Sequence, residues 1–206
     1  MDKSKFFDVV RKELFGGKLT PSQVEGMERI LNYRDEKYGH WNDDWLAYGL
    51  ATVFHETAQT MQPIREYGSE AYLKSKKYYP WYGRGLIQIT WESNYLKYGI
   101  KRPEDALRWD TALYVMFDGM EKGRFTGKAL KHYFNDTTKD PVNARRIING
   151  TDKAHLIAGY HTKFREALRK AYSAPQKPVE APPAIPVAEP EENWLVRLLK
   201  ALFKRS

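Results

Sequence analysis

Apolar residues recur at helical spacing along most of the chain, up to about Tyr172. This periodicity predicts helices over residues 4–15, 20–38, 43–63, 93–98, 110–122, 142–148 and 152–172. Residues 86–90, with the sequence Leu-Ile-Gln-Ile-Thr, are the one stretch that favours a strand, and it is short. We therefore expect an all-α fold with at most a minor β element.

Two of the predicted helices begin with capping signals. Thr20 is followed by Pro21 and Gln23, the pattern of a capping box with proline in the first turn. Asp43 or Asp44 can cap the next helix. These signals place the starts of both helices.

The composition changes abruptly near Ser173. Six of the 11 prolines fall in residues 173–190, so we expect an extended linker after a domain over residues 1–172. Residues 191–206 have apolar side chains at helical spacing, with Arg197, Lys200 and Lys204 on the opposite face. Such an amphipathic cationic helix suits an anionic membrane or lipopolysaccharide, and docking on the domain is the alternative.

Basic residues outnumber acidic ones in the domain as well as in the whole chain. The 206 residues carry a net charge of +8, and residues 1–172 hold 29 basic against 22 acidic residues, a net charge of +7. This excess suits an anionic partner such as a bacterial wall polymer. No basic run or readout motif accompanies the charge, so we do not expect nucleic-acid binding.

Several common kinds of site are excluded by the residue types. The absence of cysteine excludes disulfides, thiol nucleophiles and cysteine-ligated zinc. His55 and Glu56 start a zinc-protease motif, but Gln59 stands where the second histidine is needed. Gly83 and Gly85 lack the ending of a phosphate loop. We therefore expect neither a metal nor a cofactor.

Carboxylates near the middle of the chain are the remaining candidates for chemistry. Glycoside hydrolysis needs one protonated and one ionised carboxyl. Glu56 follows an apolar helical run, where partial desolvation would favour the protonated form. Glu66 follows Pro63 on a predicted loop, where solvation would keep it ionised, and Glu70 competes for this role.

An ordered set of motifs resembles the family 19 chitinases, and more closely the phage lysozyme-type endolysins of that superfamily. The motifs are His55-Glu56-Thr57, a second Glu, Gly83-Arg84-Gly85-Leu86-Ile87-Gln88-Ile89-Thr90 with Asn94-Tyr95, and Ile147-Ile148-Asn149-Gly150. They span about residues 47–150. The resemblance implies a helical, two-lobed lysozyme-like fold with a central cleft.

The resemblance also implies catalytic roles. Glu56 matches the general acid, and Thr90 matches the hydroxyl that helps hold the attacking water. Glu66 is the match for the general base, with Glu70 as the alternative. These roles together imply single-displacement hydrolysis with inversion.

Further residues of the same motifs are implied to contact sugar. The positions matching the family's cleft are Gln88, Asn94 and Asn149. Tyr82 and Trp91 flank the motif over residues 83–90, which we call the signature, and we expect their rings in the cleft. Arg84 either contacts the substrate or is a buried ion-pair partner that holds the cleft wall.

The expected function is therefore that of an endolysin or lysozyme that hydrolyses the glycan strands of peptidoglycan and lyses a host cell. The chain has no stretch typical of a secretory signal and no apolar run long enough to span a bilayer. We expect a monomer that accumulates in a bacterial host cytoplasm and needs a separate pore protein. The alternatives are a chitinase, a lytic transglycosylase, and a non-catalytic wall- or membrane-binding protein.

Overall fold

The computed structural model describes residues 1–173, so the predicted cationic helix and all of the predicted linker except Ser173 lie outside the described residues. The α-helices of this part are α1 (Lys3–Glu13), α2 (Pro21–Lys37), α3 (Asp43–Glu56), α4 (Glu70–Lys74), α5 (Glu92–Leu96), α6 (Trp109–Lys122) and α7 (Ala154–Tyr172). Short 3₁₀ helices cover η1 (Pro103–Leu107), η2 (Leu130–His132) and η3 (Asn143–Ile147). The fold is all-α with one minor sheet, as predicted.

The predicted helix starts are confirmed in one case and corrected in the other. The Thr20 hydroxyl accepts the Gln23 N–H at 3.2 Å, and the Gln23 side chain accepts the Thr20 N–H at 2.9 Å, which completes the capping box. Helix α3 is capped by Asn42 instead of by Asp43 or Asp44, because the Asn42 side chain accepts the Trp45 N–H at 3.0 Å.

The segment over residues 86–90 is a tight reversal of the chain, and the prediction of a strand there was wrong. The sheet consists of β1 (Ile64–Arg65) and β2 (Arg84–Gly85), paired antiparallel with Ile64 opposite Gly85. The chain then folds back, so that Arg84 and Ile89 exchange both backbone hydrogen bonds, and Gln88 has a φ of 53°. The apolar residues that suggested a strand are buried because this reversal enters the core.

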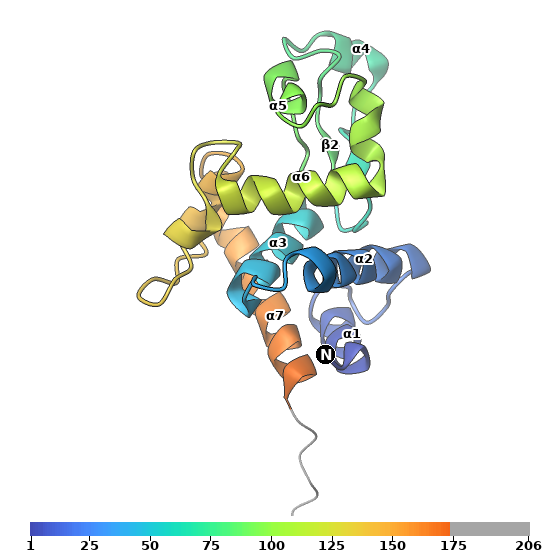
Figure 1. Ribbon diagram of the computed structural model, residues 1–206. Helices are drawn as coiled ribbons and strands as arrows, with labels where there is room; N and C mark the ends of the chain where they lie inside the picture. The colour runs from blue at the N-terminus through green and yellow to red at the C-terminus, as the bar shows by residue number, and fades with distance from the viewer. Residues whose placement is uncertain (174–206) are drawn as a thin grey trace, which may run out of the picture. The chain divides into compact units, whose positions relative to one another are not determined.

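Helix α3 forms the centre of the larger, helical part of the domain. All its residues from Leu46 to Phe54 are buried, and it packs along α7, which also contacts α1. Figure 1 shows α1, α2, α3 and α7 at one end, α6 crossing the middle, and α4, α5 and β2 at the other end. Because α3 ends at Glu56, the most buried helix delivers that carboxylate to the middle of the domain. None of the helices in residues 1–173 has both the length and the apolar character that spanning a membrane requires.

His161 is a buried histidine on α7 that lacks hydrogen-bond partners for both ring nitrogens. Its ring stacks near Phe134, with the ring centroids 5.1 Å apart, and its Nε2 lies 3.6 Å from the Asp44 carboxylate. Asp44 is also contacted by Lys139 and Arg165. Burial lowers the pKa of His161 to about 4, despite the opposing pull of Asp44.

The depressed pKa of His161 predicts a loss of stability in acid. The unfolded chain takes up a proton near pH 6.5 and the folded chain only near pH 4, so the contribution is complete above pH 6.5 and falls as the pH drops. We expect His161 to account for a decrease of about 2 kcal/mol in the free energy of unfolding between pH 7.5 and pH 5. Urea unfolding at both pH values measures it.

The matched control is the exposed His155 on the same helix. His161→Leu should remove this part of the pH dependence, whereas His155→Leu should retain it. An unchanged difference between the two pH values in His161→Leu would contradict the assignment.

Candidate active site

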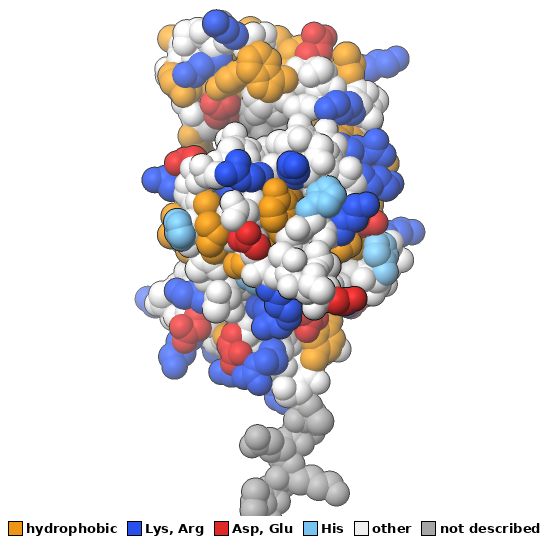
Figure 2. All heavy atoms as spheres, turned by 90° about the vertical axis from the view of Figure 1, so that its left-hand side faces the viewer, with side chains coloured by type: hydrophobic (Ala, Val, Ile, Leu, Met, Phe, Trp, Pro, Cys, Tyr) orange, Lys and Arg blue, Asp and Glu red, His pale blue; other side chains and the backbone are white. Residues whose placement is uncertain are grey.

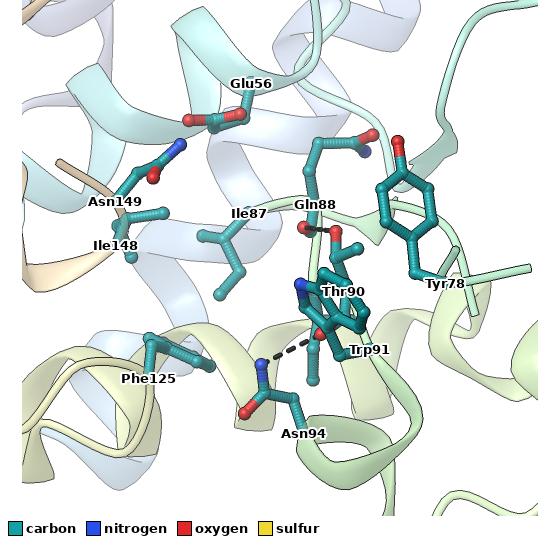
Figure 3. A pocket seen from close by; sticks show the side chains of 11 residues that line it. Glu56, Tyr78, Ile87, Gln88, Thr90, Trp91, Asn94, Phe125, Ile148 and Asn149 are labelled. Carbon is teal, nitrogen blue, oxygen red and sulfur yellow. Dashed lines mark hydrogen bonds between the residues drawn. The ribbon is translucent and has the colours of Figure 1, made fainter. Parts of the chain in front are cut away.

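A pocket of about 450 Å³ opens between the end of α3, the chain from the loop after α4 through the reversal to α5, the loop between α6 and η2, and the residues that follow η3. Figure 3 shows how its side chains face the same space. The lining residues are Glu56, Tyr78, Ile87, Gln88, Ile89, Thr90, Trp91, Asn94, Phe125, Ile148 and Asn149. The structure thus brings together six of the predicted site residues, which are Glu56, Gln88, Thr90, Trp91, Asn94 and Asn149.

Glu56 forms a largely buried ion pair that the sequence analysis did not predict. Its side chain is 15% exposed, and its Oε1 accepts a hydrogen bond from Arg145 Nη1 at 2.5 Å. The Arg145 side chain is only 5% exposed, and its Nε donates to the Asp152 carbonyl at 3.0 Å. Two opposite charges therefore meet where little water reaches them, and each compensates the burial of the other.

His55, beside Glu56, is half-buried and faces the same charges. Burial lowers the pKa of His55, the Glu56 carboxylate opposes this effect, and Arg145 adds to it. The ring is therefore neutral at pH 7. Within residues 1–173, no group of three His, Cys, Asp or Glu side chains is arranged to hold a metal ion.

The chain that leaves Glu56 is held in a strained turn. Ala58, Gln59 and Met61 all have positive φ, between 47° and 68°, which is unfavourable for residues with a Cβ. The backbone of α2 packs closely against this turn at Gly26. A Cβ added there would lie only 1.9 Å from the Met61 carbonyl oxygen. The Gln23 side chain also donates to the Gln59 carbonyl at 3.1 Å. Thus the N-terminal part of α2 fixes where α3 ends and where Glu56 points.

Glu66 is positioned by the two-residue sheet. Glu66 directly follows β1 and lies opposite Gly83. The Gly83 N–H donates to Glu66 Oε2 at 3.0 Å. The Tyr78 hydroxyl donates to the other carboxylate oxygen, also at 3.0 Å. Burial and this bond raise the pKa of Tyr78 to about 12, so it remains a neutral donor.

Glu66 does not itself line the pocket, whereas its partner Tyr78 does. Glu70, the alternative base, lies in the first turn of α4 and pairs with Arg65 at 3.2 Å, with 58% of its side chain exposed. Neither contact of Glu70 involves a pocket residue. The arrangement therefore favours Glu66 over Glu70, with Tyr78 standing between Glu66 and the pocket.

The polar residues of the reversal are held by backbone contacts. Gln88 donates both amide hydrogens, to the carbonyls of Ile64 and Gly85, and so joins the loop to β1. The Thr90 hydroxyl donates to the Gln88 carbonyl at 3.0 Å, and Asn94 donates to the Thr90 carbonyl at 2.8 Å (Figure 3). These bonds use donors of Gln88 and Thr90 and leave lone pairs on their side-chain oxygens, whereas the Asn94 oxygen already accepts from Lys97 at 2.9 Å.

The aromatic and basic residues near the signature divide into two groups. Trp91 is 50% exposed, lines the pocket and meets the Tyr78 ring edge to face, with centroids 5.4 Å apart. Tyr82 and Arg84 do not line it. Arg84 is 2% exposed, stacks on the Tyr82 ring at 3.7 Å and donates to the Pro80 carbonyl, so these two residues hold the wall behind the pocket.

Two residues that shape this site, Tyr78 and Arg145, were not predicted from the sequence. Tyr78 was one of several tyrosines near the signature, and nothing in the local pattern distinguished it. Arg145 stands shortly before the Ile147–Gly150 motif, which is the one signal that could have drawn attention to it.

No protein-family model, curated protein or solved structure matches this chain.

Replacement of Gly26 tests whether close packing against α2 holds the turn that follows Glu56 at the end of α3. Gly26→Ala places a Cβ against the Met61 carbonyl, and we expect a loss of roughly 1–3 kcal/mol in the free energy of unfolding. Gly159→Ala is the control, because this helical glycine of α7 has no atom within 4 Å of an added Cβ and should gain about 0.5–1 kcal/mol. Thermal and urea unfolding measure both, and equal stabilities would contradict the close contact.

Proposed function

We propose that this protein is a glycosidase that hydrolyses the glycan strands of peptidoglycan by an inverting acid–base mechanism. The observation that supports this proposal is the convergence of residues in one pocket. The end of α3, the reversal with α5, and the loop after η3 supply Glu56, Thr90 with Asn94, and Asn149. These are positions that the resemblance to the family 19 enzymes had picked out from widely separated motifs.

Glu56 acts as the general acid in this proposal. Its carboxyl reaches the pocket, and Arg145 fixes its orientation. A sugar chain that fills the pocket removes the remaining water from a carboxyl that is only 15% exposed, and in this proposal that carboxyl carries the proton to be transferred. The proton then goes to the oxygen of the departing sugar as the glycosidic bond breaks.

Glu66 acts as the general base through Tyr78. The Tyr78 hydroxyl already donates to Glu66 and faces the pocket. It receives a proton from the attacking water while it passes its own proton to Glu66, and the water oxygen bonds to the anomeric carbon. Thr90 is placed to orient that water, because its oxygen keeps lone pairs free at the pocket.

Trp91, Asn94 and Asn149 hold the sugar chain. Trp91 lines the pocket and is 50% exposed, and a flat ring covers the apolar face of a sugar well. Asn94 and Asn149 supply amide groups beside it. Gln88 has both amide hydrogens engaged, so it contributes its oxygen.

Removal of the proposed acid is the first test. Glu56→Gln keeps the shape of the side chain but has no proton to transfer, so we expect kcat on purified peptidoglycan to fall by about 10²–10⁴-fold. Glu36→Gln, an exposed change on α2, is the control and should leave kcat unchanged. Circular dichroism and thermal unfolding confirm folding. A well-folded Glu56→Gln protein with near-normal turnover would refute the mechanism.

The route through Tyr78 predicts a pattern among variants. Tyr78→Phe and Glu66→Gln should each lower kcat by roughly 10²-fold or more, and the double variant should be little worse than either, because both break one proton path. Tyr72→Phe, a tyrosine outside the pocket, is the control. If Glu66→Gln is inactive while Tyr78→Phe keeps full kcat, Glu66 contacts the water directly and the route is wrong.

A lytic transglycosylase is a second candidate, favoured by one observation. Glu56 is the single carboxyl among the residues that line the pocket, and such an enzyme can use one glutamate. It leaves an anhydro sugar, whereas a hydrolase adds water to its product. Mass spectrometry of the first fragments released from purified wall therefore decides between the two reactions.

The predicted role in host lysis depends on this activity. An enzyme of this kind that accumulates in a bacterial cytoplasm needs a separate membrane pore to reach the wall. We retain this as part of the proposal, with the membrane-binding role of residues 191–206 as a further prediction.

A further inference from the structure

Basic side chains are concentrated in the part of the chain that forms one side of the pocket. Residues 122–153 contain eight Lys and Arg residues but three Asp and Glu residues. This segment supplies Phe125, Ile148 and Asn149 to the pocket lining. It lies on the left in Figure 1, and Figure 2, which views that side, shows many Lys and Arg side chains spread over the face.

Half of these basic residues already have carboxylate partners. Arg145 pairs with Glu56, Lys139 pairs with Asp44, and Asp118 pairs with both Lys122 and Arg124. The other four form no ion pair within residues 1–173, and these are Lys128, Lys131, Arg146 and Lys153. Cations without an ion-pair partner on one side of a pocket can attract an anionic ligand.

One threonine connects two of the four residues to the edge of the pocket near Phe125 and Ile148, which we call the lip. The Thr126 hydroxyl donates to the Arg146 carbonyl at 2.6 Å and accepts the Lys128 N–H at 3.3 Å. Thr126 directly follows Phe125, and Arg146 precedes Ile148 by two residues, so both anchors adjoin lining residues. Lys128 and Arg146 are exposed, so Thr126 holds the backbones of two exposed basic residues together next to the lining residues.

We propose that Lys128 and Arg146 form a carboxylate-binding site at the pocket lip that selects a carboxyl-bearing glycan over a neutral one. The inference rests on the proposed function and names its substrate class. Peptidoglycan carries carboxylates on its lactyl-linked peptides, whereas chitin has none. A guanidinium and an ammonium bind carboxylates by charge-assisted hydrogen bonds, and Arg146 does so with two parallel donors. The lip thus discriminates between the two polymers that the pocket alone would accept.

Wall binding by a catalytically impaired protein tests the site without requiring turnover. In the full-length Glu56→Gln background, Lys128→Gln/Arg146→Gln is compared with Lys12→Gln/Lys37→Gln, which removes the same charge from exposed positions of α1 and α2. Each protein is sedimented with purified wall sacculi and with the same sacculi after their carboxyls have been amidated. The apparent Kd is measured at low and high salt.

We expect the lip variant to bind native sacculi roughly three- to tenfold more weakly than its parent, with the difference lost at high salt and on amidated sacculi. The control variant should match the parent on both. Equal weakening on native and amidated sacculi, or equal weakening by the control, would overturn the carboxylate site. Because binding is measured, a failure of the proposed hydrolysis is seen separately, as an absence of product from the unmodified protein.

Discussion

The ion pair between Glu56 and Arg145 is the interaction on which the site depends. Burying a carboxylate at the end of a core helix is costly unless a partner neutralises it, and removing one partner leaves the other charge uncompensated. Arg145 supplies that partner, and the N–H groups of Ile148 and Asn149 both donate to its backbone carbonyl. The same residue therefore holds the carboxyl and places Asn149 beside it.

The opposite wall of the pocket is held by a different kind of constraint. Two residue pairs of sheet are too few to be stable alone, but Gln88 and Glu66 add side-chain bonds across the same junction. Helix α2 fixes the strained turn after Glu56 from the other side. The pocket is thus assembled from pieces that are individually weak, each fixed by contacts to a neighbouring element. This arrangement explains how a minor sheet can decide the position of Glu66.

The helical fold followed from the sequence because its signals are local. The Thr20 capping box and the apolar run of α3 need only a few neighbouring residues to be recognised. The end of α3 was predicted too late, at residue 63 instead of Glu56, because the turn after Glu56 is held by contacts with α2. The reversal at Gln88 was mistaken for a strand, since a short run of apolar residues looks the same whether it lies in a sheet or fills a core. Contacts between distant segments, such as Arg145 with Glu56 or Tyr78 with Glu66, leave no periodic trace, so spacing alone does not predict them.

The configuration of the first reducing end released from peptidoglycan tests the central claim most directly. Proton NMR recorded during the first minutes, before the anomers equilibrate, distinguishes the α from the β form. Cleavage of a β-linked strand with water delivered from the Tyr78 side and the proton from Glu56 predicts an initial excess of the α anomer. An initial excess of the β anomer, or a product with no reducing end, would contradict the account.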